Sequence, residues 1–301
     1  MNYDLRVEFE YEYQPPVAGG RHLVRIAPMT IDGAQRVVAS SIVFDPIPVE
    51  RIDRRDFFGN AVAAVNLRER HASLKVAMNA RVRVEAPGAT FDVSPDPKTL
   101  RRELAETLSL VPDSPHHFTA SSPRVLLDDD ITAYARKSLN PARTARQIVG
   151  SLGERIHADF TYDNESTEVE TAPKAAFQQR RGVCQDFTHV MIAALRGIGI
   201  PAGYVSGYLR TVPPRGEPQL AGADAMHAWV RAWCGRETGW VAYDPTNRTF
   251  AGEDHIVAAI GRDYDDVAPI SGILRTSGHQ RTSHSVDVTP IPEKGRSGAD
   301  A

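Results

Sequence analysis

A cysteine, a histidine and an aspartate occupy positions in this chain from which they could act together as a nucleophile, its base and an orienting acid. Cys184 follows Gly182, which lets the backbone turn tightly, and precedes apolar residues at helical spacing. We therefore expect it in the first turn of a helix, where free N–H groups and the positive end of the helix dipole favour a thiolate. The same N–H groups, that of Cys184 included, could hold the oxyanion of a tetrahedral intermediate.

His227 is the candidate base that would take the proton of the thiol and later protonate the leaving group. It lies in a segment, residues 226–233, whose alternation of side chains predicts a strand. Asp244 ends the next predicted strand, and a short turn at residues 235–239 would join the two strands as a hairpin. In that hairpin His227 and Asp244 lie nearly opposite each other, so the carboxylate can fix the tautomer of the imidazole.

Two neighbours of these residues are candidate substrate contacts. Gln185 follows the cysteine directly and is expected to line the cleft. Trp229 shares the predicted strand face of His227 and could form a wall for the acyl group, although core packing explains a tryptophan there equally well. The second cysteine, Cys234, stands at a strand end and is interpreted as a thiol without a chemical role.

Other polar residues are interpreted as structural. His189 lies five residues beyond Cys184, about 140° away around a helix, and should point elsewhere. Asp186 would compensate the helix dipole or accept a hydrogen bond. The histidine pair at 116–117 lacks a third ligand at a metal-like spacing, and the acidic run at 263–266 lacks the glycine and closing glutamate of a calcium loop. We therefore expect no metal and no cofactor.

The first 86 or so residues read as strands. Residues 5–13 alternate apolar and polar side chains, and further β-rich segments separated by turn signals continue to residue 84. This pattern predicts an N-terminal antiparallel β-sandwich domain over residues 1–86, which docks on the rest of the chain without supplying a catalytic residue. The stretch 86–97, rich in proline and other turn formers, marks its end.

Residues 97–288 are predicted to form the catalytic domain. Helical periodicity covers residues 128–139 and 144–160, and strand patterns return after residue 201. The whole chain is thus predicted to be an α+β protein, in which the catalytic domain packs helices against an antiparallel sheet. The tail at 289–301 contains prolines and charged residues and is predicted to be disordered.

Three motifs carry a family resemblance. Residues 182–187 (Gly-Val-Cys-Gln-Asp-Phe), 227–229 (His-Ala-Trp) and 243–247 (Tyr-Asp-Pro-Thr-Asn) resemble, in this order, the core motifs of the bacterial transglutaminase-like superfamily. The resemblance implies a papain-like α+β core with a catalytic triad, made here of Cys184, His227 and Asp244.

Other stretches resemble one bacterial branch of that superfamily, which has a β-rich N-terminal domain. These stretches are residues 56–60, 196–202, 205–208 and 261–264, and the resemblance extends from about residue 3 to residue 288. One departure is Met226, where the branch usually has a serine before the histidine. The departure concerns the shape of the pocket rim and leaves the triad intact.

The composition argues against several classes of partner. Among 301 residues, 35 are basic and 38 acidic, so a net charge of −3 gives no electrostatic reason to expect nucleic acid or an anionic membrane. No stretch approaches the roughly 18 apolar residues that span a bilayer. The N-terminus lacks the features of a signal peptide, and two cysteines make no disulfide framework. We therefore expect a cytoplasmic protein; its oligomeric state is left open.

The predicted reaction is acyl transfer from an amide in a peptide or protein. Cys184 would attack a peptide or isopeptide carbonyl and hold the acyl group as a thioester. Water would release that group in a protease or amidase, and an amine would do so in a transglutaminase. The triad is the same for both; we favour hydrolysis because it needs no second substrate site. A non-catalytic binding module of the same fold is the remaining alternative, and the intact triad argues against it.

Overall fold

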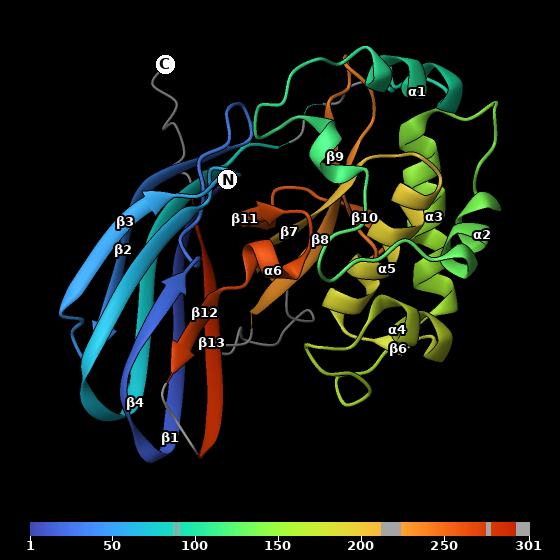
Figure 1. Cartoon of the computed structure of the whole chain (residues 1–301). Coiled ribbons are helices and arrows are strands. Elements are labelled where there is room, and N and C mark those ends of the chain that lie inside the picture. The colour runs from blue at the N-terminus through green and yellow to red at the C-terminus, as the bar shows by residue number, and fades with distance from the viewer. Residues whose placement is uncertain (87, 89–90, 212–223, 275–277, 293–301) are drawn as a thin grey trace, which may run out of the picture.

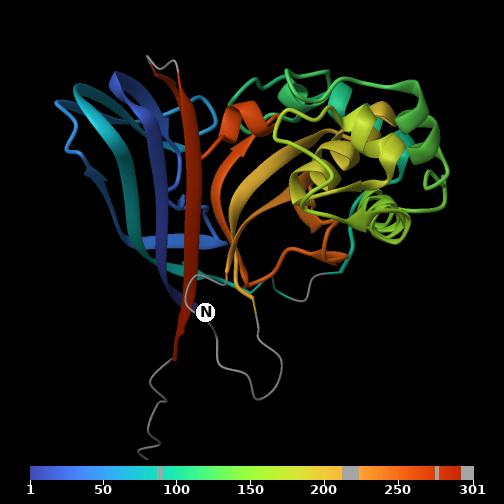
Figure 2. The ribbon, with the colours of Figure 1, turned by 90° about the horizontal axis from the view of Figure 1, so that it is seen from below.

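Two antiparallel sheets and a group of helices form the protein (Figure 1). The computed structural model describes residues 1–86, 88, 91–211, 224–274 and 278–292. Figures 1 and 2 show the same order of layers from two directions, with the core sheet between the N-terminal sheet and the helices. The α+β class, with an antiparallel N-terminal region followed by helices against an antiparallel sheet, is confirmed.

The N-terminal sheet has six strands that come from both ends of the described chain. They are β1 (Asn2–Val24), β2 (Gln35–Asp45), β3 (Glu50–Arg55), β4 (Ala61–Val84), β12 (Ile270–Leu274) and β13 (His279–Ile291). β1 and β4 are 23 and 24 residues long, so each can pair with two shorter strands, one after the other, along the same edge. Along its length β1 pairs first with β13 and then with β12, while β4 pairs first with β3 and then with β2. The strands therefore form one continuous sheet rather than the two sheets expected of a sandwich.

The predicted end of the catalytic domain at residue 288, and the disordered tail predicted from residue 289, are wrong where the chain is described. β12 and β13 leave the core and pair with β1, in a ladder that reaches Ile291. Val286 and Val288 are fully buried in the N-terminal sheet, which explains why this segment is ordered. The remainder of the predicted tail, residues 293–301, lies outside the described residues.

The core sheet has the strand order β10-β9-β8-β7-β11. Its strands are β7 (Ala202–Leu209), β8 (Ala225–Trp233), β9 (Trp240–Asp244), β10 (Thr249–Phe250) and β11 (His255–Gly261). The predicted hairpin of β8 and β9 is present, closed by hydrogen bonds between Cys234 or Gly235 and Gly239. β11, at the edge of the sheet, was not predicted.

The helices between residues 129 and 197 cover one face of the core sheet, as Figure 1 shows. No helix in the described ranges is long and apolar enough to cross a membrane. The helices are α1 (Pro97–Ala105), the 3₁₀ turn η1 (Pro115–Phe118), α2 (Asp129–Arg136), α3 (Ala145–Asp159), α4 (Pro173–Gln179), α5 (Cys184–Gly197) and α6 (Tyr264–Val267). Two short strands, β5 (Thr161–Tyr162) and β6 (Arg181–Gly182), pair beside the start of α5.

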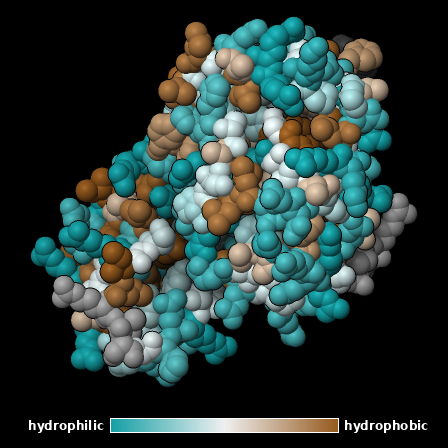
Figure 3. Space-filling model, turned by 45° about the vertical axis from the view of Figure 1, so that its right-hand side comes forward, coloured by the Kyte–Doolittle hydropathy of each residue, from teal (hydrophilic) through white to brown (hydrophobic). Residues whose placement is uncertain are grey.

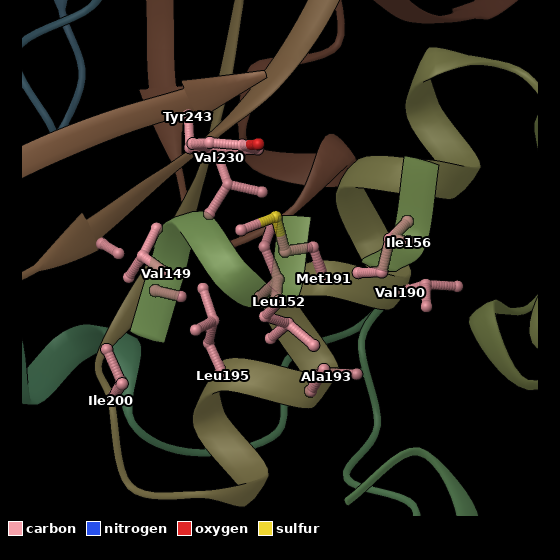
Figure 4. Packing of buried hydrophobic residues seen from close by; sticks show 14 of the residues in the cluster. Val149, Leu152, Ile156, Val190, Met191, Ala193, Leu195, Ile200, Val230 and Tyr243 are labelled. Carbon is pink, nitrogen blue, oxygen red and sulfur yellow. The ribbon is translucent and has the colours of Figure 1, made fainter. Parts of the chain in front are cut away.

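Helix α5 runs through the centre of the main hydrophobic cluster. Met191 and Leu195 of α5 pack with Leu152 of α3 and with Val230 of β8, and all four are fully buried (Figure 4). Burial stabilises each such side chain by about 1.5–3 kcal/mol relative to exposure. Packing on both sides thus fixes the helix that begins with Cys184.

On the face shown in Figure 3, hydrophilic side chains cover most of the surface and apolar ones form small separate groups.

Two amide side chains from the N-terminal region close the outer edge of β11. The side chain of Gln35 accepts a hydrogen bond from the N–H of Val257 at 2.8 Å and donates to its carbonyl at 2.7 Å. Asn60 makes the same pair of bonds with Ile260, both at 2.8 Å. Both amides are buried, and each imitates a neighbouring strand. They satisfy backbone groups that would each cost about 1–3 kcal/mol if left buried and unpaired.

We expect the protein to lose stability below about pH 6.5, the ordinary pKa of histidine. His189 on α5 is buried, and its Nε2 accepts a hydrogen bond from the N–H of Tyr264. Burial, aided by Arg124 and Arg196, lowers the pKa of His189 to about 3. The folded chain therefore binds fewer protons than the unfolded one as pH falls, so acidification favours unfolding. Above the ordinary pKa, both states are neutral at this site and the effect disappears.

The variant His189→Gln keeps an acceptor for Tyr264 but does not titrate. Between pH 7.5 and pH 5, its free energy of unfolding should fall by about 2 kcal/mol less than that of the parent. Urea unfolding at the two pH values measures this difference. Parallel losses in parent and variant would contradict the assignment of His189 as a buried neutral histidine.

Candidate active site

The start of α5 is held by a buried aspartate. Oδ2 of Asp186 accepts hydrogen bonds from the N–H of Val183 at 2.8 Å and from the hydroxyl of Thr167 at 2.7 Å. A β-carbon at Gly182 would lie 2.5 Å from the same carboxylate, so only glycine fits there. Asp186 is thus the hydrogen-bonding residue expected from the sequence, and it fixes the turn that leads into Cys184.

His227 and Asp244 meet on one face of the β8–β9 hairpin. Nε2 of His227 lies 2.7 Å from Oδ2 of Asp244. The register pairs Val230 with Tyr243, so Asp244 is a diagonal neighbour of His227 rather than its direct partner. The hairpin therefore brings the two groups together as predicted, but the residue of β8 directly opposite Asp244 lies two positions beyond His227.

Cys184 lies beside the same imidazole and is, with Asp244, one of the two groups that raise the pKa of His227. Since Nε2 of His227 is engaged with Asp244, Nδ1 is the atom left for the thiol. α5 thus supplies one end of the arrangement, and the core sheet supplies the other two groups. Cys184 is half-buried, whereas His227 is 8% exposed and Asp244 is fully buried.

The electrostatics of the site favour a charged histidine. Burial opposes an imidazolium, but hydrogen bonds and charges from Asp244 and Cys184 outweigh it and raise the pKa of His227 to about 10. Burial also opposes ionisation of Asp244, yet hydrogen bonds from His227, His255 and Asn247 hold its pKa well below the usual range. At neutral pH the site can therefore hold a charged imidazole of His227 against the carboxylate of Asp244.

Five donors surround the carboxylate of Asp244. Oδ1 accepts the backbone N–H groups of Thr246 at 2.9 Å and Asn247 at 3.1 Å. Oδ2 accepts the side-chain amide of Asn247 at 2.7 Å, in addition to His227, and Nε2 of His255 lies 3.2 Å from it. Sequence reasoning missed His255. It begins an apolar run that could have been recognised as a strand, but nothing local to residue 255 points to Asp244.

Of the two candidate substrate contacts, Trp229 is used for packing. It is 1% exposed, so it has no surface to present to an acyl group. Its ring stacks on His227 with centroids 6.1 Å apart and meets His255 edge-on at 5.2 Å. The alternation of β8 correctly placed Trp229 beside His227, but alternation does not show which faces are covered. Gln185 donates a hydrogen bond to the carbonyl of Val169 at 2.9 Å, and its contact with substrate stays a prediction.

The remaining polar candidates have structural partners. His116 and His117 bond backbone carbonyls of Thr107 and of residues 110–111. Asp263 accepts the N–H of Arg124. Within the described ranges, no group of three or more histidine, cysteine, aspartate or glutamate side chains could hold a metal ion.

We predict that iodoacetamide alkylates Cys184 more than about 10-fold faster than Cys234 at pH 7.5, since thiolate content and access set the rate. Cys184 is half-buried beside His227, whereas burial raises the pKa of the Cys234 thiol to about 12. Peptide mapping after brief labelling measures the ratio, with Cys184→Ser as control. Equal labelling, or preference for Cys234, would contradict the assignment of the nucleophile.

Comparison with known proteins shows similarity over both the N-terminal region and the core of the chain. The transglutaminase-like superfamily matches residues 130–245, and the bacterial transglutaminase-like N-terminal region matches residues 3–83. The uncharacterized protein Rv2569c of Mycobacterium tuberculosis is 36% identical over 261 residues, which cover 85% of this chain and 83% of the relative. The uncharacterized protein ML0607 of Mycobacterium leprae is 31% identical over 291 residues, 93% of this chain and 96% of the relative.

A solved structure has the same fold. A candidate cysteine protease from Cytophaga hutchinsonii superposes with a TM-score of 0.76 at 20% identity, covering 97% of this chain and 91% of its own. The similarity in sequence to the mycobacterial proteins extends over both the N-terminal region and the core. The chain therefore belongs to the transglutaminase-like superfamily and carries its bacterial N-terminal region.

Proposed function

We propose that the protein is a cysteine-dependent acyl-transfer enzyme that cleaves amide bonds of a peptide or protein. The observation that carries the proposal is that one imidazole, His227, is bonded to the buried carboxylate of Asp244 and lies beside the thiol of Cys184. If the pair of His227 and Asp244 were only structural, it would not need a cysteine at a helix N-terminus on the side of the imidazole that faces away from Asp244. The fold shared with the candidate cysteine protease of Cytophaga hutchinsonii is consistent with this chemistry.

Each residue has a defined part in the proposed reaction. The Cys184 thiolate attacks the amide carbonyl carbon, and N–H groups at the start of α5 hold the oxyanion. The C–N bond breaks as the imidazolium of His227 gives its proton to the leaving amine, which leaves a thioester. Water then attacks the thioester while His227 takes its proton, and the C–S bond breaks to free the carboxylic acid. Asp244 orients the imidazole throughout and stabilises its charged form.

Hydrolysis is our first choice, because it requires water alone as the second reactant. The alternative is transfer to a primary amine, which the same triad would catalyse if the cleft excluded water and bound the amine. A non-catalytic binding module would not be expected to form a thioester at all. Hydrolase and transferase therefore differ in what happens after the thioester has formed, and the binding module differs from both in forming none.

The test uses p-nitrophenyl acetate as an acyl donor, followed by a panel of peptidyl-glutamine and lysine-isopeptide amides. Intact mass should show one acetyl group on Cys184, lost with time in water. Glycine ethyl ester is then added as an acceptor amine. Release as acid at an unchanged rate supports hydrolysis, whereas conversion to the amide product favours the transferase. A chain that never carries the acyl group, or carries it elsewhere than on Cys184, would refute acyl transfer through this residue.

We further predict that Asp244→Asn slows acylation less than Cys184→Ala or His227→Ala. Loss of an orienting aspartate costs about 10⁴-fold in comparable triads, less than loss of the nucleophile or base, because the aspartate exchanges no proton with substrate. Stopped-flow release of p-nitrophenol measures the rates, and circular dichroism checks the fold. Unfolding of Asp244→Asn would show a structural rather than a catalytic carboxylate.

A further inference from the structure

We propose that His255 is a positioning residue of this active site, which holds the carboxylate of Asp244 in the orientation that serves His227. The inference rests on the proposed function, since it assigns a role within the same triad. His255 is the first residue of β11 and is 8% exposed. Its Nε2 lies 3.2 Å from Oδ2 of Asp244, the oxygen that Nε2 of His227 approaches at 2.7 Å.

The proton of His255 can be placed from its two contacts. Nδ1 accepts a hydrogen bond from the backbone N–H of Gly252 at 3.2 Å. A backbone N–H can only donate, so Nδ1 carries no proton, and in the neutral ring the proton is on Nε2. Nε2 therefore donates to Asp244. With both nitrogens engaged and the ring set against Trp229, His255 cannot serve as a second base.

His255 differs from the other supports of the carboxylate in where it comes from. Thr246 and Asn247 belong to the same turn as Asp244, so their hydrogen bonds would move with the carboxylate. His255 comes from β11, a separate strand at the edge of the core sheet, whose outer side is bonded to Gln35. Apart from His227 itself, it is the one donor to Asp244 among the described residues that ties the carboxylate to a different part of the fold.

Loss of the hydrogen bond from His255 to Asp244 should change the reactivity of Cys184. If the carboxylate turns away, the imidazolium of His227 loses stabilisation, and the thiolate paired with it then forms only at higher pH. The reaction of Cys184 with iodoacetamide reports this directly and needs no natural substrate. Its rate is measured between pH 4 and pH 9 with the full chain.

Two substitutions separate the two nitrogens of His255. His255→Gln places an amide N–H where Nε2 was and can still donate to Asp244. His255→Asn places an oxygen where Nδ1 was, so it keeps the bond to Gly252 but cannot reach Asp244. We expect His255→Asn to move the acidic limb of the alkylation profile to higher pH and to slow labelling at pH 6 about 10-fold or more, as loss of supporting hydrogen bonds does elsewhere. His255→Gln should recover most of the rate.

A double variant distinguishes positioning from general support. If His255 acts through Asp244, then His255→Asn combined with Asp244→Asn should be no slower than Asp244→Asn alone. Ile256→Val, a change at the next β11 residue, which is buried among N-terminal side chains, is the control and should leave the profile unchanged. Thermal unfolding midpoints confirm that each protein is folded at the temperature of the assay.

The outcomes separate this inference from the proposed function. An unchanged profile for His255→Asn, equal losses in the Asn and Gln variants, additive losses in the double variant, or a loss that follows unfolding would each overturn the role of His255. Asp244→Asn with the profile of the parent would overturn the triad itself. The triad and the role of His255 are both supported if Asp244→Asn shifts the pH profile of alkylation, His255→Asn reproduces part of that shift, and His255→Gln does not.

Discussion

The structure depends on a carboxylate buried away from water. A fully buried charge that loses its partner costs about 3–5 kcal/mol, so Asp244 is tolerable only where donors surround it on every side. The turn at residues 244–247, the histidine of β8 and the histidine of β11 all direct N–H groups at it. The register of the β8–β9 hairpin and the place of β11 in the sheet can thus be understood as the conditions under which this charge can be buried.

The thiol approaches the site from the other layer of the fold. Cys184 begins the most deeply buried helix, and its place relative to the core sheet is set by side chains such as Met191 packed against Val230. Cores of this kind pack as densely as organic crystals and transmit small displacements instead of absorbing them. The distance between nucleophile and base is therefore a property of helix-to-sheet packing, and changes far from the cysteine can alter it.

The sequence predicted those features of the structure that depend on residues close together in the chain. The helix start at Cys184 and the hairpin that unites His227 with Asp244 follow from periodicity and a short turn, because their partners are near in the chain. The same reasoning missed His255, and it assigned the strand patterns at residues 272–274 and 283–288 to the catalytic domain instead of pairing them with β1, since both depend on contacts between distant segments. Trp229 shows a third limit, because alternation gives the face of a strand but not what covers it.

The pairing of β1 with β13 has a consequence for synthesis on the ribosome. The β4 partner of β1 is complete at residue 84, but the strands that pair with the other edge of β1, residues 270–291, are made almost 250 positions after β1. Until then a nascent chain exposes the N–H and C=O groups of a long strand, and open strand edges recruit other strands. The charged residues that alternate along β1, among them Arg6, Glu8 and Glu10, would keep that waiting edge from joining another chain.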